Sequence, residues 1–340
     1  MGAPTIGRVE ATEELTPSQR RTFERLIGPG ERPLFPADVV SHLRDRIEEA
    51  VRAVELPEPL WLGKSTLNDL ARCAGLFDAI RAGERGPFSF TSRFAAGRLA
   101  HKAVELDVAG RVDRDSHGLV EAAVDRLVDD EAFRGVWDGL DGLRRDETLM
   151  DAAKTLELFR STMPPLRRMR RELAPSTEWH VRVELLGGAV VLSGTMDLVL
   201  GSGWPVEPGR ATRLAIDLKT GRAWPEHAED MRFYALLLAL RFGVPPYRVA
   251  TLYLDSGEWQ AEDVDQRILD RAAERVIGAV RSAAASEAGR ELDLVPGPYC
   301  RWCPRAGVCP VSAFPSERDP VDRDPSERDP AAPEALSTLD

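Results

Sequence analysis

Two aspartates lie in the most apolar part of the chain, between Ser193 and Thr220. Asp197 stands in VVLSGTMDLVL and Asp217 in RLAIDLK, two runs of β-branched and apolar residues that predict strands joined by a Gly/Pro-rich turn. A carboxylate in a half-buried strand is costly unless something pairs with it. Two such carboxylates on neighbouring strands therefore predict a metal site.

Lys219 follows Asp217 by two residues, and side chains two apart on a strand point to the same face. The chain has four lysines beside a large excess of arginine, so background composition does not explain a lysine at this place. Lysine can donate or accept a proton or supply a point charge, whereas arginine stays protonated. The alternative interpretation is a surface hairpin with solvated charges.

A histidine lies on a helix predicted for residues 91–110. Gly97 and His101 are four apart on one helix face, and Glu105 follows one turn later. A lone histidine on such a face is usually structural. It becomes a candidate ligand if the predicted hairpin lies opposite.

Three cysteines follow a C-x2-C-x5-C spacing near the end of the chain, and Cys73 is the one other cysteine. Such a grouping in a reducing cytosol favours a metal centre over disulfides. Four thiolates suit an iron–sulfur cluster or a zinc ion, and spacing alone leaves both open. Taken alone, Cys73 is typical of an ordinary buried cysteine.

Helices and strands alternate around these residues, a pattern that predicts an α/β unit with a mixed sheet. A single helix is expected to carry Cys73, and a later helix to carry Tyr234. Helices are predicted at residues 65–80, 229–243 and 263–286, and further strands at 176–188, with Gly187-Gly188 as the hairpin turn, and at 247–255.

The formal net charge of −11 does not fit a general nucleic-acid binder. From Val311 onward, eight acids and three arginines contribute −5, which leaves −6 for the rest. Any contact with a polyanion must then be local. The densest basic cluster predicts either a phosphate contact or a solvated helix end, and consists of Arg167, Arg168, Arg170 and Arg171.

No apolar run is long enough to cross a membrane, and the N-terminal residues lack the features of a secretory signal. The sequence therefore predicts a cytoplasmic protein without membrane contact.

Five motifs follow one another along the chain: G-x-x-x-H at 97–101, GTMD at 194–197, DLK at 217–219, YALLL at 234–238 and the one-plus-three cysteines. Together, in this order, they resemble the RecB-like branch of the PD-(D/E)XK nuclease superfamily. Within that branch, the pattern is similar to the four-cysteine iron–sulfur nucleases of AddB-type helicase-nuclease subunits and CRISPR-associated exonucleases. One departure is Asp230, which stands where the family's helix motif usually has glutamine.

The resemblance implies roles for these residues. Lys219 would be the catalytic lysine, acting with Asp217 and Asp197, and Tyr234 would order the site or the DNA. The ligands of a Mg²⁺ or Mn²⁺ ion would be His101, Asp197, Asp217 and the backbone carbonyl of Leu218. A [4Fe–4S] cluster, with Zn²⁺ as the alternative, would be bound by Cys73, Cys300, Cys303 and Cys309.

The implied fold class is α/β, a restriction-endonuclease-like core with a mixed central sheet flanked by helices, and with helical N-terminal and inserted regions. The expected parts are a helical region at 1–58, the nuclease domain at 59–310 with a helical insertion at about 118–172, and a disordered acidic tail at 311–340, in which PSERDP repeats.

The implied activity is metal-dependent hydrolysis of DNA phosphodiester bonds by an exonuclease, on DNA ends or single strands, in repair, recombination or defence. Because the sequence lacks a G-x-x-x-x-G-K-S/T loop, ATP-driven translocation would need a separate helicase subunit. One alternative is a DNA-binding module whose catalysis is weakened by Asp230. The other is an accessory subunit of a helicase-nuclease complex.

Overall fold

The computed structural model describes residues 14–28, 31–86, 91–110, 114–201 and 207–312. The predicted tail from residue 313 onward and the centre of the Gly/Pro-rich linker, 202–206, lie outside these ranges. The chain divides into two compact units, and each is described by itself. The larger unit comprises Met1–His42, Phe90–Val181 and Thr195–Leu269, and the smaller unit comprises Leu43–Ser89, Arg182–Gly194 and Asp270–Asp340.

The elements of the first half of the chain are mainly helical. They are α1 (Pro17–Thr22), the π-helix η2 (Phe23–Ile27), α2 (Val39–Val51), β1 (Leu60–Leu62), α3 (Lys64–Arg72), α4 (Ala74–Arg81), α5 (Ser92–Ala109), α6 (Ser116–Arg126), α7 (Glu131–Trp137), α8 (Gly142–Thr162) and α9 (Arg170–Leu173).

The second half contains most of the strands. Its elements are β2 (Ser176–Leu185), the short 3-10 helix η3 (Leu186–Gly188), β3 (Val190–Leu200), β4 (Leu214–Lys219), α10 (Pro225–Phe242), β5 (Arg248–Tyr253), β6 (Glu258–Asp263), α11 (Gln266–Glu287) and the 3-10 helix η4 (Pro298–Trp302).

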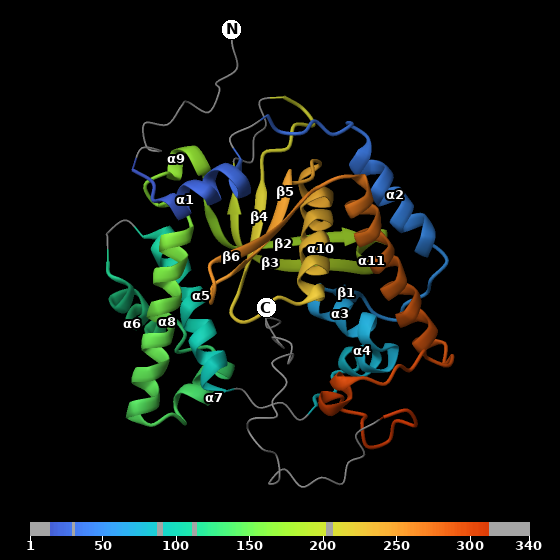
Figure 1. The fold of residues 1–340 in the computed structure, drawn as a ribbon. Coiled ribbons are helices and arrows are strands. Elements are labelled where there is room, and N and C mark those ends of the chain that lie inside the picture. Colours follow the sequence, from blue (N-terminus) through green and yellow to red (C-terminus); the bar gives the residue numbers. More distant parts are fainter. Residues whose placement is uncertain (1–13, 29–30, 87–90, 111–113, 202–206, 313–340) are drawn as a thin grey trace. The chain divides into compact units, whose positions relative to one another are not determined.

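The sheet of the larger unit is mixed (Figure 1). β3 pairs with β4 in antiparallel fashion, with Leu198 opposite Ile216. β4 and β5 are parallel, and β5 and β6 are antiparallel. Every residue of β4 is buried, as expected for a central strand covered on both faces.

The two faces of β4 are covered by different helices. The side chains of Leu214, Ile216 and Leu218 belong to an apolar core that also contains residues of α5, α6 and α8. Since side chains alternate along a strand, the intervening residues of β4 point to the other face, where α10 contacts β4 and β5. Asp217 and Lys219 are therefore on the α10 face.

Helices α6, α7 and α8 each begin at an aspartate whose carboxylate accepts a hydrogen bond from a backbone N–H three residues later. These N-caps are Asp115, Asp130 and Asp141. The helices pack on α5 through side chains that are almost fully buried, among them Leu99 and Leu156.

Arginine side chains tie together the helices of the smaller unit. Arg46 on α2 pairs with Asp270 and Glu274 of α11, both at 2.5 Å. Arg275 of α11 donates a hydrogen bond to Asn68 of α3 at 2.8 Å. In the same unit, β1 runs parallel to the start of β3.

The predicted fold class, α/β with a mixed sheet flanked by helices, is confirmed. One predicted element is wrong: the single helix expected at 65–80 is broken at Cys73, whose extended backbone (φ −164°, ψ 128°) separates α3 from α4. The short strands β1 and β6 were not predicted from the sequence. Within the described ranges, no helix has the length and the apolar character needed to span a membrane.

Candidate functional site

The two predicted carboxylates lie on adjacent strands of the larger unit. Asp197 is on β3 and Asp217 is on β4. One oxygen of Asp197, Oδ2, accepts a hydrogen bond of 2.6 Å from the backbone N–H of Leu218. This bond fixes the Asp197 carboxylate against the strand that carries the second acid.

Lys219 and Asp217 form a buried ion pair, with Nζ 2.9 Å from Oδ2. The side chains are 7% and 1% exposed, so both charges are removed from water. Such a pair is costly to bury, and neither charge is tolerated there without the other. The prediction that these two side chains share one face of the strand is confirmed.

His101 of α5 reaches the same place, with Nδ1 3.5 Å from Oδ1 of Asp197. The close approach of α5 depends on Gly97, because a Cβ at that position would lie 3.0 Å from Oγ1 of Thr220, the residue after Lys219. The G-x-x-x-H spacing thus has a physical basis: glycine admits the helix to the end of β4, and the histidine follows one turn later.

Two residues of α10 that the sequence singled out are buried. Tyr234, 1% exposed, donates a hydrogen bond of 2.5 Å to the carbonyl of Thr195, two residues before Asp197. This places Tyr234 as a support of β3 rather than at the surface. Asp230 is 4% exposed, so it too is removed from solvent.

Glu178 of β2 is a neighbour that the sequence did not reveal. Although this residue is exposed overall, desolvation and then the negative charge of Asp197 raise the pKa of its carboxyl, while His101 opposes the rise. Its φ of 48° lies in the left-handed region, which is rare for a residue within a strand and is often found at functional sites. Neither property can be read from residue type or spacing.

A second unpredicted neighbour is Tyr253 of β5, which stands opposite Lys219 in the parallel register. Its hydroxyl lies 3.2 Å from Nδ1 of His227 on α10. Burial raises the pKa of Tyr253, the charge of Lys219 opposes the rise, and that of Asp217 adds to it. Only the sheet register brings this tyrosine to the carboxylates.

Most of the groups predicted to hold a metal fit a hard cation by their chemistry, since the carboxylate and carbonyl oxygens suit Mg²⁺ or Mn²⁺, and the imidazole of His101 is the one nitrogen donor among them. As arranged, Lys219 holds an oxygen of Asp217, and the N–H of Leu218 holds an oxygen of Asp197. In the part of the chain that the structure describes, no three His, Cys, Asp or Glu side chains form a ready metal-binding group.

The four cysteines all belong to the smaller unit and line one cavity of about 320 Å³. Burial raises the pKa of Cys303, the backbone N–H of Arg305 opposes this, and the other three thiols add to the rise. Four thiols are donors that suit a soft metal centre, either an iron–sulfur cluster or zinc. As arranged in the described part of the chain, no three of them form a ready metal-binding group. The structure thus brings Cys73 and the distant C-x2-C-x5-C segment to one cavity, and metal binding by these cysteines stays a prediction.

The predicted arginine cluster lies at and just before α9 in the larger unit. Arg168, Arg170 and Arg171 are exposed. Arg170 also donates a hydrogen bond of 2.5 Å to the carbonyl of Val108 in the last turn of α5. Arg170 therefore stabilises a helix end, and Arg168 and Arg171 are exposed.

Residues 62–310 match the family described as the PD-(D/E)XK nuclease superfamily. No curated protein matches the sequence. Among solved structures, a candidate exonuclease from Eubacterium rectale is 13% identical, with a TM-score of 0.41 over 73% of this chain and 86% of its own. The crystal structure of SSO0001 is 14% identical, with a TM-score of 0.31 over 79% of this chain and 93% of its own.

Proposed function

Because the chain belongs to the PD-(D/E)XK nuclease superfamily, we propose that it is a Mg²⁺- or Mn²⁺-dependent deoxyribonuclease, an exonuclease acting on DNA ends or single strands. The observation that carries this proposal is the buried pair of Lys219 and Asp217 at 2.9 Å, beside Asp197 and His101. A protein that used this hairpin only for folding would gain little from a buried ion pair, because apolar residues of similar size are often as stable or more so.

Each residue of the group has a role in phosphodiester hydrolysis. Asp197, Asp217, His101 and the Leu218 carbonyl would hold the divalent cation, which when bound offsets phosphate charge and acidifies water. The ammonium of Lys219 orients the attacking water and stabilises the negative charge that develops on the phosphate. Tyr234 acts as a positioning residue, since its bond to Thr195 fixes the strand that bears Asp197.

We further propose that the four cysteines bind a [4Fe–4S] cluster, with Zn²⁺ as the alternative. The support is their convergence on one cavity in the smaller unit. The thiolate, not the thiol, is the metal ligand, so binding there would release protons. The cluster would have a structural role within that unit.

The test is cleavage of end-labelled single-stranded and duplex DNA by anaerobically purified protein, with and without Mg²⁺ or Mn²⁺. Asp217→Asn and Lys219→Ala should each lower the cleavage rate by roughly two orders of magnitude or more. The matched control is Asp263→Asn on β6, whose carboxylate is exposed and pairs with Arg248. If both site variants cleave at the wild-type rate, the activity does not come from this site.

The second candidate function is DNA binding with weakened catalysis, either as a module of its own or as an accessory subunit of a helicase-nuclease complex. The residue that favours this function is Asp230. A buried carboxylate stands where the family's helix motif has an amide. On this alternative, wild-type protein binds DNA without cutting it, and Asp230→Gln gains cleavage. If wild-type protein cleaves DNA and Asp230→Gln cleaves it at the same rate, this second candidate function is excluded.

A further inference from the structure

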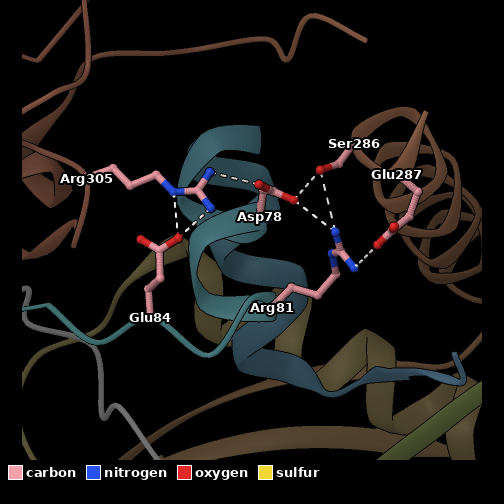
Figure 2. Close-up of polar contacts among 6 residues, drawn as sticks. All are labelled: Asp78, Arg81, Glu84, Ser286, Glu287 and Arg305. Carbon is pink, nitrogen blue, oxygen red and sulfur yellow. Dashed lines mark hydrogen bonds and ion pairs between the residues drawn. The ribbon is translucent and has the colours of Figure 1, made fainter. Parts of the chain in front are cut away.

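An ion network in the smaller unit joins the cysteine segment, Cys300–Cys309, to helix α4 (Figure 2). Arg305, which lies between the second and third cysteines of that segment, donates a hydrogen bond of 2.8 Å to Oδ2 of Asp78. Its Nε and Nη2 donate hydrogen bonds of 2.9 and 2.6 Å to Oε1 of Glu84. One guanidinium therefore spans two carboxylates, a geometry that the planar fork of arginine permits and lysine does not.

The same network extends to α11. The other oxygen of Asp78 accepts hydrogen bonds from Ser286 and, at 3.0 Å, from Arg81. Arg81 in turn donates a 2.6 Å hydrogen bond to Glu287. The Asp78 side chain is 12% exposed, and although burial works against it, the bonds from Ser286, Arg305 and Arg81 lower its pKa. Asp78 is thus a charged anchor whose position is set from two helices.

Two further contacts hold the segment at the same place. The hydroxyl of Tyr299 donates a 2.6 Å hydrogen bond to the carbonyl of Arg72, the residue before Cys73. A Cβ at Gly86 would lie 1.7 Å from the carbonyl oxygen of Trp302, so the backbone after α4 lies directly against the backbone of the segment.

We propose that Arg305 is a positioning residue for the metal centre: by bridging Asp78 and Glu84 it holds the cysteine segment beside Cys73 before any metal binds. This inference rests on the metal centre proposed above. A segment that is already ordered loses less conformational freedom when the metal binds, so affinity is higher than for a mobile segment. The thiols are then gathered by charge, and the metal completes the site.

The first measurement is hydrogen exchange of the metal-free, reduced full-length protein. Arg305→Gln should raise the exchange rate of residues 298–309 by about tenfold or more, with little change in α2 and α11 of the same unit. The matched control, Arg290→Gln, removes an exposed arginine of the same unit and should leave all rates unchanged. Arg305→Lys, which keeps the charge but not the fork, should fall between Arg305→Gln and wild type.

The second measurement is titration of the same proteins with Co²⁺, whose thiolate charge-transfer absorption reports binding at cysteines. Arg305→Gln should bind Co²⁺ about tenfold more weakly than wild type and Arg290→Gln. If wild type shows no such absorption, the metal centre is refuted, while the exchange rates still decide whether Arg305 holds the segment.

Unchanged exchange at 298–309 in Arg305→Gln would overturn the proposal, as would faster exchange spread equally over the whole smaller unit. If that variant does not fold, Glu84→Gln replaces it. Loss of the Glu84 charge leaves the bond to Asp78, so a several-fold rise in exchange confined to 298–309 is expected. No rise in Glu84→Gln refutes the role.

Discussion

At the scale of single residues, the candidate active site depends on paired charges and on one glycine that allows a close approach. Lys219 and Asp217 lie 2.9 Å apart in a buried strand, so each charged group has a partner of opposite sign. His101 meets Asp197 because Gly97 lets α5 approach the end of β4. A small steric change is therefore expected to affect chemistry more than folding.

Gly97→Ala tests this directly. The new Cβ would lie 3.0 Å from Oγ1 of Thr220, which displaces either the helix or the residue after Lys219. Since misplacement of about 1 Å can lower a rate up to about a hundredfold, we expect a DNA cleavage rate reduced at least about tenfold. Thermal stability should change little, because the cost of this displacement is offset by the higher helix propensity of alanine, which favours a helix over glycine by up to about 1 kcal/mol.

The control for Gly97→Ala is Gly135→Ala in α7. A Cβ there meets no atom within 4 Å, so the change should keep the cleavage rate and raise thermal stability slightly. Equal cleavage rates for both variants would contradict the close-approach argument.

Asp69 of α3 predicts a pH dependence of stability. Burial, opposed by Arg72 at 3.4 Å, raises the pKa of its carboxyl to about 6. Because the folded state binds this proton more tightly than the unfolded state, in which the pKa is near 4, the carboxyl contributes stability at pH values below 4. This contribution is lost as the pH rises through the folded-state pKa of about 6. Relative to Asp69→Asn, the free energy of unfolding of wild type should fall by at most about 3 kcal/mol between pH 4 and pH 7.

Urea denaturation of the metal-free proteins at intervals of pH measures this difference. A difference between wild type and Asp69→Asn that stays constant across the range would show that the carboxyl is not perturbed by folding.

At the scale of elements, one helix supports a strand of the site, and another carries exposed positive charge. α10 supports β3 through the bond from Tyr234 to Thr195. The segment at α9 has two different uses, since Arg170 stabilises the end of α5 by a hydrogen bond, while Arg168 and Arg171 are exposed side chains that a phosphate backbone could contact.

Arg168→Glu combined with Arg171→Glu should therefore weaken DNA binding. Each lost phosphate contact with duplex DNA reduces the slope of log affinity against log salt by about 0.9, so a flattening of up to about 2 is expected. Binding measured at several salt concentrations gives the slope. The control is charge reversal of Arg126 on α6 and Arg134 on α7, both exposed, which should change the salt slope less. Equal slopes for wild type and both double variants would mean that Arg168 and Arg171 are merely solvated.

At the scale of the whole molecule, the cysteines join parts of the smaller unit that are far apart in sequence. Cys73 sits at the break between α3 and α4, and the extended backbone of that break, rather than a helix face, presents its thiol to the cavity. A metal bound there would cross-link the two ends of the unit, as a disulfide closing a long loop would.

Cys303→Ser should therefore reduce the metal content of anaerobically purified protein to near zero. For a [4Fe–4S] cluster, wild type is brown, absorbs broadly near 400 nm and carries about four irons per chain. Val308→Ser, a change at an exposed residue of the same cavity, should keep the full content. Colourless wild type with one zinc per chain would refute the cluster and leave the thiolate site, and wild type without metal would refute both.

The sequence by itself determined the features that depend on local geometry. Asp217 and Lys219 share a face because a strand alternates its side chains, and His101 follows Gly97 by one helical turn. Ordered motifs were likewise sufficient for the family and for the α/β fold class. Local periodicity was not sufficient at Cys73, where the sequence pattern is helical but the backbone is extended.

Only the tertiary structure decided which distant groups surround these residues. Tyr253 stands opposite Lys219 through the register of parallel strands, and Glu178, whose pKa Asp197 raises, has an unusual backbone conformation. Arg305 pairs with Asp78 across 227 residues of chain. The physical reason is that backbone dihedrals set the spacing of neighbours along one element, whereas contacts between elements depend on how the whole chain packs, which no single stretch of sequence encodes.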